Sequence, residues 1–103
     1  MVQDCDTLAY IIKNCPNVKE LSLPYQCGIT NFSKYLKIQS KIKLKHFILT
    51  DIEYIPPKDV AEFVKKYMIN KGELWFWFNL QIPNNYFHEV QALLPKDFIF
   101  NVS

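Results

Sequence analysis

The sequence predicts an α/β fold, in which helices alternate with parallel strands to form a small solenoid of three to four repeated units. Apolar residues at helical spacing are followed by apolar residues at strand spacing, and this order recurs along the 103 residues. The expected strand centres lie about two dozen residues apart, which is a typical period for α/β repeats. A small doubly wound sheet is the alternative, and the recurring strand pattern favours the solenoid. Residues 1–103 are expected to form a single domain.

The first unit combines a helix at residues 8–15 with a strand at residues 18–23. Pro16 marks the boundary, because proline cannot continue a helical hydrogen-bond ladder and the residue before it favours an extended backbone. The apolar residues follow an L-x-x-L-x-L pattern in the strand and are, in chain order, Leu8, Ile11, Ile12, Cys15, Val18, Leu21 and Leu23.

Three further units follow by the same reasoning. A short helix is expected after Thr30, which could cap it, and a strand at residues 44–49 repeats the first strand pattern. Pro56 and Pro57 open a helix that should extend to Asn70 and end at Gly72. Its expected apolar face comprises Val60, Phe63, Val64, Tyr67 and Met68. A strand at 74–78, a helix at 83–94 and a strand at 97–100 complete the chain.

The register of the strand at 74–78 stays open, because every position is apolar. Leu74, Phe76 and Phe78 in the core would leave Trp75 and Trp77 partly exposed, which suits their polar ring atoms. A slip of one residue would exchange the two sets. Burial of the whole strand on both faces is a further alternative, since continuous apolar runs are typical of buried parallel strands.

Composition and charge make specific nucleic-acid readout less expected. The net charge is +2, all twelve basic residues are lysine, and arginine, which reads guanine edges and phosphates with two parallel hydrogen bonds, is absent from the sequence. A local lysine run could be a solvated face or could meet a phosphate-bearing or acidic partner, and it comprises Lys34, Lys37, Lys41, Lys43 and Lys45.

The sequence gives no pattern for catalysis, metal or cofactor binding. Cys5, Cys15 and Cys27 are spaced by ten and twelve residues, and His46 and His88 lie far downstream, which is not metal-ligand spacing. No nucleophile motif surrounds these residues. We therefore expect a protein that is not an enzyme and needs no cofactor, and Cys15 and Cys27 are expected to be small buried thiols at the turns.

The chain is expected to lie in the cytoplasm or nucleus. Its first residues lack the basic and apolar regions of a secretory signal, and no apolar run reaches the roughly 18 residues of a membrane span. Three cysteines, an odd number, fit reduced intracellular thiols.

In a solenoid of this kind the outward strand positions form a concave binding surface. Side chains alternate along a strand, so Leu21, Leu23, Phe47 and Leu49 should face the core. The candidate partner-binding residues on the concave face are Glu20, Ser22, His46, Ile48, Thr50, Trp75 and Trp77.

The pattern from Leu8 to Thr30 resembles the cysteine-containing leucine-rich repeat of F-box proteins. The residues that carry it are Leu8, Ile11, Ile12, Lys13, Asn14, Cys15, Pro16, Asn17, Val18, Leu21, Leu23, Cys27, Ile29 and Thr30. The resemblance implies a protein-interaction module that recognises the substrate of a ubiquitin ligase. It departs from the family at Cys27, one position late, and at Ile52, which replaces the recurring residue after the second strand. No F-box precedes the repeats, so this chain is expected to be a C-terminal fragment that binds a protein target and lacks the ligase-binding half.

Two other function classes remain as alternatives. The segment Lys71 to Phe78 partly imitates the aromatic strand of RNA-recognition domains, although Glu73 and Leu74 miss that motif. The second alternative is a scaffold whose uncovered terminal repeats associate with further copies.

Overall fold

The computed structural model describes residues 7–25, 32–79, 81–82 and 84–103. Its elements, in chain order, are α1 (Thr7–Asn14), β1 (Glu20–Pro24), the 3₁₀ helix η1 (Phe32–Lys37), β2 (Leu44–Ile52), α2 (Pro57–Tyr67), β3 (Met68–Phe78), α3 (Tyr86–Leu93) and β4 (Ile99–Val102). The predicted capping residue Thr30 and the cysteines Cys5 and Cys27 lie outside the described residues.

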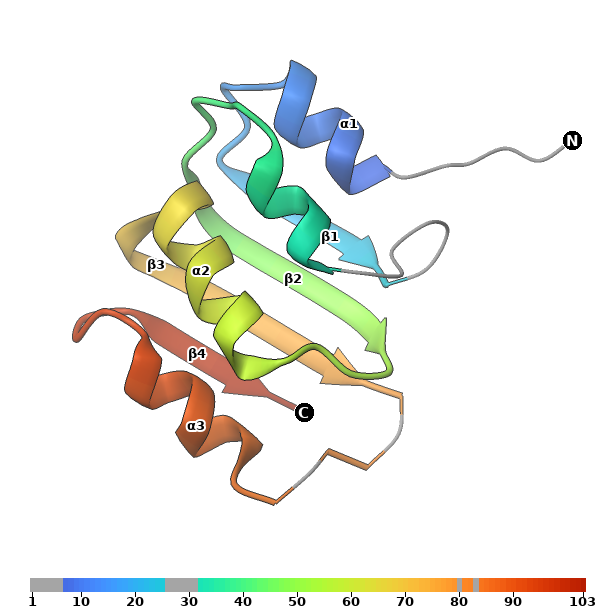
Figure 1. Cartoon of the computed structure of the whole chain (residues 1–103), viewed down its shortest axis with the longest axis vertical. Coiled ribbons are helices and arrows are strands. Elements are labelled where there is room, and N and C mark those ends of the chain that lie inside the picture. The colour runs from blue at the N-terminus through green and yellow to red at the C-terminus, as the bar shows by residue number, and fades with distance from the viewer. Residues whose placement is uncertain (1–6, 26–31, 80, 83) are drawn as a thin grey trace, which may run out of the picture.

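The four strands form one parallel sheet in the order β1-β2-β3-β4. The helices lie together on one side of this sheet (Figure 1). The molecule is accordingly a two-layer structure, with extents of 39, 29 and 20 Å. The predicted α/β class is confirmed.

The register of the sheet aligns residues at nearly equal intervals along the chain. Glu20 pairs with His46, His46 with Glu73 and Glu73 with Ile99, at intervals of 26, 27 and 26 residues. The same pairing aligns the next, core-facing position of each strand. Every strand therefore presents corresponding residues to the same face of the sheet.

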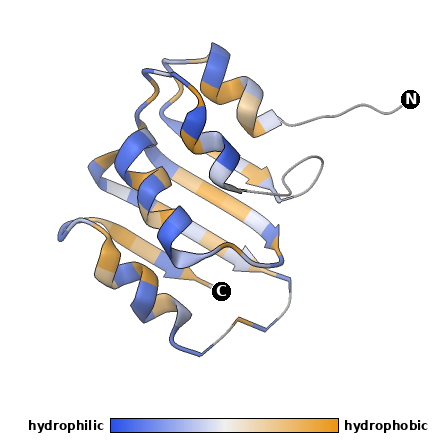
Figure 2. Ribbon diagram, viewed as in Figure 1, coloured by the Kyte–Doolittle hydropathy of each residue, from blue (hydrophilic) through white to orange (hydrophobic). Residues whose placement is uncertain are grey.

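The core lies between the sheet and the helices. Phe47 and Leu49 of β2 are fully buried, as predicted, whereas Leu21 and Leu23 of the edge strand β1 are half-buried against the same cluster. Figure 2 shows a hydrophobic middle of β2 and a mixed hydrophobic and hydrophilic α2. This is the pattern of a helix that buries only one face.

Two buried tyrosines join the connections to the helices by hydrogen bonds. The Tyr67 hydroxyl, at the end of α2, donates to the carbonyls of Tyr35 and Ile38, which lie in or just after η1. The Tyr86 hydroxyl of α3 donates to the Ile55 carbonyl at 2.6 Å. Both rings contribute to the apolar core while their hydroxyls satisfy backbone carbonyls in the connections.

The prediction that the third helix extends to Asn70 is wrong. The helix α2 ends at Tyr67, and Met68 already has the extended backbone that begins β3, with φ −124° and ψ 155°. Gly72 is consequently a buried strand residue and not a helix cap. A Cβ atom there would lie 3.0 Å from the Lys45 carbonyl oxygen, so the close approach of β2 explains why this position is glycine.

Other predicted boundaries shift by one to three residues. The last helix begins at Tyr86, after Asn85 in the left-handed region with φ 67°, and the last strand occupies Ile99–Val102. The helix after Thr30 is a 3₁₀ helix. Cys15, expected to be buried, is a half-buried free thiol at the end of α1.

Candidate functional site

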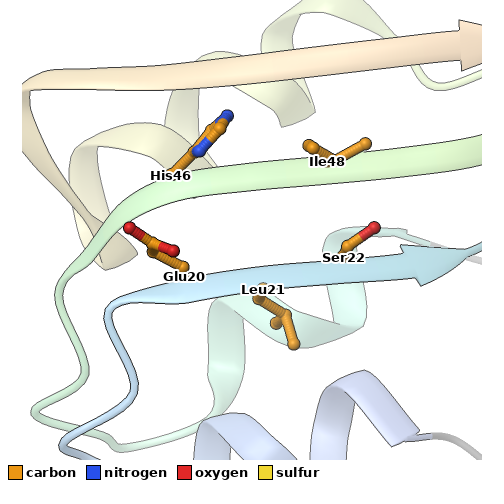
Figure 3. A pocket seen from close by; sticks show the side chains of 5 residues that line it. All are labelled: Glu20, Leu21, Ser22, His46 and Ile48. Atoms are coloured by element: carbon orange, nitrogen blue, oxygen red, sulfur yellow. The ribbon is translucent and has the colours of Figure 1, made fainter.

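Among the residues that the structure describes, no helix packs on one surface of the sheet, and we call this surface the open face. It consists of alternate strand residues on the side opposite the buried core positions, namely Glu20, Ser22, Pro24, His46, Ile48, Thr50, Glu73, Trp75, Trp77, Ile99 and Asn101. Figure 3 views this face, with the helices behind the strands.

All seven residues predicted as candidate binding residues lie on the open face. Glu20 and Ser22 of β1 are exposed, and three residues of β2 are half-buried, namely His46, Ile48 and Thr50. On β3, Trp75 is half-buried and Trp77 is 51% exposed. The alternation rule therefore brings these side chains together from three neighbouring strands.

The structure also decides the register that the sequence left open. Leu74 and Phe76 are each 1% exposed in the core, and Phe78 is half-buried, so the two tryptophans point to the other side of the sheet. The slipped register is wrong. Within the described residues of this chain the strand is not buried on both faces, because half of the Trp77 surface is accessible.

A shallow pocket of about 290 Å³ lies on the open face between β1 and β2. It is lined by Glu20, Leu21, Ser22, His46 and Ile48. In Figure 3, the side chains of Glu20, Ser22, His46 and Ile48 lie on the viewer's side of the strands, and that of Leu21 points away from them. The pocket therefore combines a carboxylate, a hydroxyl, an imidazole and an aliphatic wall.

Beside the pocket, His46 faces a second carboxylate on the next strand. Its Nε2 atom lies 3.9 Å from Oε1 of Glu73, a distance at which the two groups form an ion pair only when the imidazole is protonated. This Nε2 atom has no hydrogen-bond partner and no accessible surface of its own. Because His46 also pairs in register with Glu20, one imidazole lies between two carboxylates.

Trp75 carries a second unsatisfied polar atom on the same face. Its Nε1 atom is buried and has no hydrogen-bond partner. Buried donors without partners cost about 1–3 kcal/mol each and are uncommon in folded proteins. The two such side-chain atoms found among the described residues, on His46 and Trp75, thus both belong to the open face.

Four residues of this surface were missed by the sequence prediction, and the first is Pro24 at the end of β1. Glu73 lies next to His46, and Ile99 and Asn101 extend the face onto β4. Glu73 directly precedes the buried Leu74, so the same alternation that selected Trp75 would have selected it. Ile99 could have been found from the alternation of Phe98 and Phe100, which are both buried.

The opposite side of the molecule has a different character. A second pocket, of about 360 Å³, is lined by Leu36, Glu62, Lys65 and Lys66. The Lys66 ammonium donates to the Leu36 carbonyl at 2.5 Å, and that of Lys43 donates to the Lys66 carbonyl at 2.9 Å. Lys66 therefore joins α2 to η1, and Lys43, a member of the predicted lysine run, joins the start of β2 to the end of α2.

Neither a metal centre nor a membrane helix emerges from the part of the chain that the structure describes. No group of three or more histidine, cysteine, aspartate or glutamate residues there could hold a metal ion. No helix among the same residues has the length and apolar character needed to cross a membrane.

The chain has no detectable relative among the proteins with which it was compared. The resemblance to F-box leucine-rich repeats consequently rests on the residue pattern from Leu8 to Thr30. No family model, curated protein or solved structure matches this chain.

Proposed function

We propose that this chain is a protein-interaction module whose four units form a small leucine-rich-repeat solenoid and whose open face binds a protein partner. The strands follow one another in sequence order, and the helices of the described residues lie on one side of the sheet. The intervals of 26, 27 and 26 residues between aligned positions fall within the 20–29-residue period of these repeats. These observations support the solenoid over a doubly wound sheet, which would have helices on both faces.

The observation that carries the binding proposal is a parallel sheet with one bare, partly aromatic face. Purely parallel sheets almost always have both faces covered, and solenoids are the arrangement in which one face stays available to partners. Trp77 is 51% exposed and Ile99 is 47% exposed on this face. Tryptophan is enriched among the residues that contribute most to protein-protein binding, because it provides a large apolar area and a polar ring nitrogen.

The F-box resemblance extends the proposal to a cellular role. In that role the bound partner is the target of a ubiquitin ligase inside the cell, and the open face presents it for modification. The bare sheet face agrees with a substrate-binding surface, and the chain itself contributes recognition and no catalysis.

The charge of the open face argues against the RNA-binding alternative. The aligned rows of this face carry the carboxylates of Glu20 and Glu73, and the nearest lysines in the strands, Lys45 and Lys71, precede these rows. Stacking of bases on Trp75 and Trp77 would bring phosphates toward these carboxylates, whereas nucleic-acid sites use positive charge to neutralise the backbone. A protein surface has no such requirement.

Site-specific photocrosslinking tests the proposal directly. A photoreactive amino acid at Ser22 samples the open face, and the same amino acid at Glu62, an exposed residue of α2, is the matched control on the helical side. In extract from the native cells, we expect a protein adduct from position 22 that is reduced by Trp77→Ala and is not formed from position 62. Adducts formed only from position 62, or insensitive to Trp77→Ala, would contradict binding at the open face.

A further inference from the structure

Lysines gather along the edge of the sheet where the strands begin. Because the strands are parallel, the turns that lead from each helix into the next strand all lie at this edge, as Figure 1 shows. We call the residues of this edge, 13–20, 38–46, 65–73 and 93–99, the basic rim. Its lysines are all exposed and comprise Lys13, Lys19, Lys41, Lys43, Lys45, Lys65, Lys66, Lys71 and Lys96.

The basic rim holds most of the positive charge of the chain. It contains nine of the twelve lysines and three of the ten acidic residues, namely Glu20, Glu73 and Asp97, so its net charge is +6 with His46 neutral. The remaining residues therefore carry −4, because the total is +2. This separation of charge turns the rim toward a negatively charged partner.

Only part of this charge serves the fold. Lys13, Lys65 and Lys66 lie in the last turns of α1 and α2, where a cation offsets the negative end of the helix dipole. Lys43 and Lys66 also donate hydrogen bonds to backbone carbonyls. The other five lysines have no such contact among the described residues, and they are Lys19, Lys41, Lys45, Lys71 and Lys96. Their ammonium groups are available to a partner.

Exposed aliphatic side chains lie on the same rim. Ile69, Leu93 and Ile99 are 37%, 45% and 47% exposed, and they are half of the large apolar residues that are exposed in the described part of the chain. Leu93 ends α3, Ile99 begins β4, and Ile69 belongs to an irregular start of β3.

The irregular start of β3 displays Ile69 beside a lysine. Between the pairs Leu44–Met68 and His46–Glu73, β2 advances by two residues and β3 by five, so β3 contains three extra residues there. Residues 69–71, which include Lys71, are all exposed. The rim thus places aliphatic side chains, which gain free energy by leaving water, among cations that no other group neutralises.

We propose that the basic rim binds the surface of a membrane that contains anionic phospholipids. The negative potential of such a surface attracts lysines, and aliphatic side chains among them enter the boundary between headgroups and acyl chains. The rim is less suited to single-stranded nucleic acid, which stacks its bases on exposed aromatic rings. The two aromatic residues of the rim other than His46, Tyr67 and Phe98, are both buried.

Binding through the rim leaves the open face accessible. The rim consists of turns and the first strand residues, whereas the open face extends along the strands, with Ile99 where the two surfaces meet. The strands would stand end-on to the membrane, and the open face would lie beside it. This inference does not depend on the proposed function, and a protein held in this way still presents its sheet to a partner.

Vesicle cosedimentation tests the proposal with the unmodified chain. Vesicles of phosphatidylcholine that contain about 30% phosphatidylserine are compared with vesicles of phosphatidylcholine alone. We expect binding to the anionic vesicles and none to the neutral vesicles. Binding should be lost at about 1 M salt, where the Debye length falls to about 3 Å.

Two triple variants of equal net charge separate the rim from the overall charge. Lys41→Gln/Lys71→Gln/Lys96→Gln changes the rim, and the matched control, Lys34→Gln/Lys37→Gln/Lys58→Gln, changes the three lysines outside it. The rim variant should lower the partition coefficient at least about tenfold, because each lysine near an anionic surface contributes about fivefold. The control should retain most of the binding. Circular dichroism verifies that each variant is folded.

A single substitution tests the aliphatic contribution. Ile69→Ser should lower the partition coefficient severalfold, because its side chain no longer gains from leaving water. Thr7→Ser, which removes one methyl group from an exposed residue of α1 away from the rim, is the control and should leave binding unchanged. Unchanged binding of Ile69→Ser would show that this side chain does not enter the membrane boundary.

The remaining outcomes separate this surface from others. Equal losses in the two triple variants would overturn the rim, because they would mean attraction by net charge alone. Equal binding to neutral and anionic vesicles, or binding to neither, would overturn the anionic membrane. A complex with polyuridylate or polyglutamate that the rim variant weakens, without vesicle binding, would assign the rim to nucleic acid or to an acidic protein instead. Photocrosslinking from Ser22 is independent of these results, so failure here leaves the proposed function standing.

Discussion

The hydroxyl of Tyr67 offers a direct test of how the connections are held to the core. It lies at the end of α2 on a fully buried ring and donates to the carbonyls of Tyr35 and Ile38, the latter at 2.8 Å. The Tyr35 carbonyl also accepts a bond from the backbone N–H of Ile38 at 3.3 Å. Removal of the hydroxyl therefore leaves Tyr35 with another donor but takes the tyrosine donor from the Ile38 carbonyl.

Tyr67→Phe isolates this contribution because it keeps the ring. The aromatic contact with Phe63, at 5.1 Å between ring centres, is retained, and no large cavity forms. We expect the free energy of unfolding to fall by about 1–3 kcal/mol, the usual cost of a buried polar group that loses its partner. Each kcal/mol corresponds to about 4–8 °C in Tm for a domain of about this size.

Urea unfolding followed by circular dichroism measures this change, and an unchanged m-value shows that only stability has altered. The control is Tyr10→Phe on α1, where the side chain is 63% exposed and the expected change is below about 0.5 kcal/mol. Equal stability of Tyr67→Phe and the unmodified chain would refute the view that this hydroxyl joins η1 to α2.

Three further predictions concern the strand β3 and the last helix. Gly72→Ala should lower the free energy of unfolding in urea by about 1–3 kcal/mol, because the new Cβ meets two backbone oxygens at 3.0 and 3.2 Å. Asn70→Ala, on the exposed part of β3, is the control and should change stability little. Equal effects of the two substitutions would contradict the close approach of the strands. Burial raises the pKa of Tyr86 above its ordinary value, so the unfolded state loses the hydroxyl proton first and the free energy of unfolding should decrease as pH rises above about 10. Urea titrations at increasing pH should show a shallower decrease for Tyr86→Phe than for the unmodified chain. Identical pH dependence of the two proteins would contradict this role of Tyr86. Trp77→Phe leaves Trp75, whose ring nitrogen is buried, as the single tryptophan, and Trp75→Phe leaves the more exposed Trp77. Acrylamide should therefore quench the fluorescence of Trp77→Phe less than that of Trp75→Phe. The reverse order would mean a different register of β3.

Most of the sheet and its open face could be predicted because both depend on alternation within strands. The pattern at Leu21, Leu23, Phe47 and Leu49 identifies the core side, and the residues between them then belong to the other side. No long-range information is needed for this step. The same logic placed all candidate residues on one surface once the strands were known to be parallel and in sequence order.

The boundary between α2 and β3 could not be predicted from spacing. Met68 continues the helical pattern of Val64 and Tyr67, and it is buried at 2% exposure, so a helical residue and a strand residue satisfy the same apolar pattern at this position. Met68 adopts the strand conformation because its pairing with Leu44 of β2 begins there. Tertiary pairing of this kind overrides local propensity, and it cannot be read from residues 57–70 alone.

The bulge at the end of β2 is a second feature that alternation misses. Leu49 pairs with Phe76 and Ile52 with Phe78, so β2 contains one extra residue there, and Asp51 takes a left-handed backbone with φ 58°. Aspartate tolerates this conformation better than most residues. Both Leu49 and Ile52 are thereby buried, although they are an odd number of residues apart.

The near-constant interval between aligned residues has a simple geometric origin. Each connection must return across the sheet by about the length of a five-residue strand, which is about 16 Å. The eleven residues of α2 cover about 16 Å as an α-helix, so β3 can begin at once after Tyr67. The six residues of η1 cover only about 12 Å as a 3₁₀ helix, and residues 38–43 complete the return before β2. The period in the sequence therefore reports the distance across the sheet, and different helix types can fill the same interval without disturbing the rows of the open face.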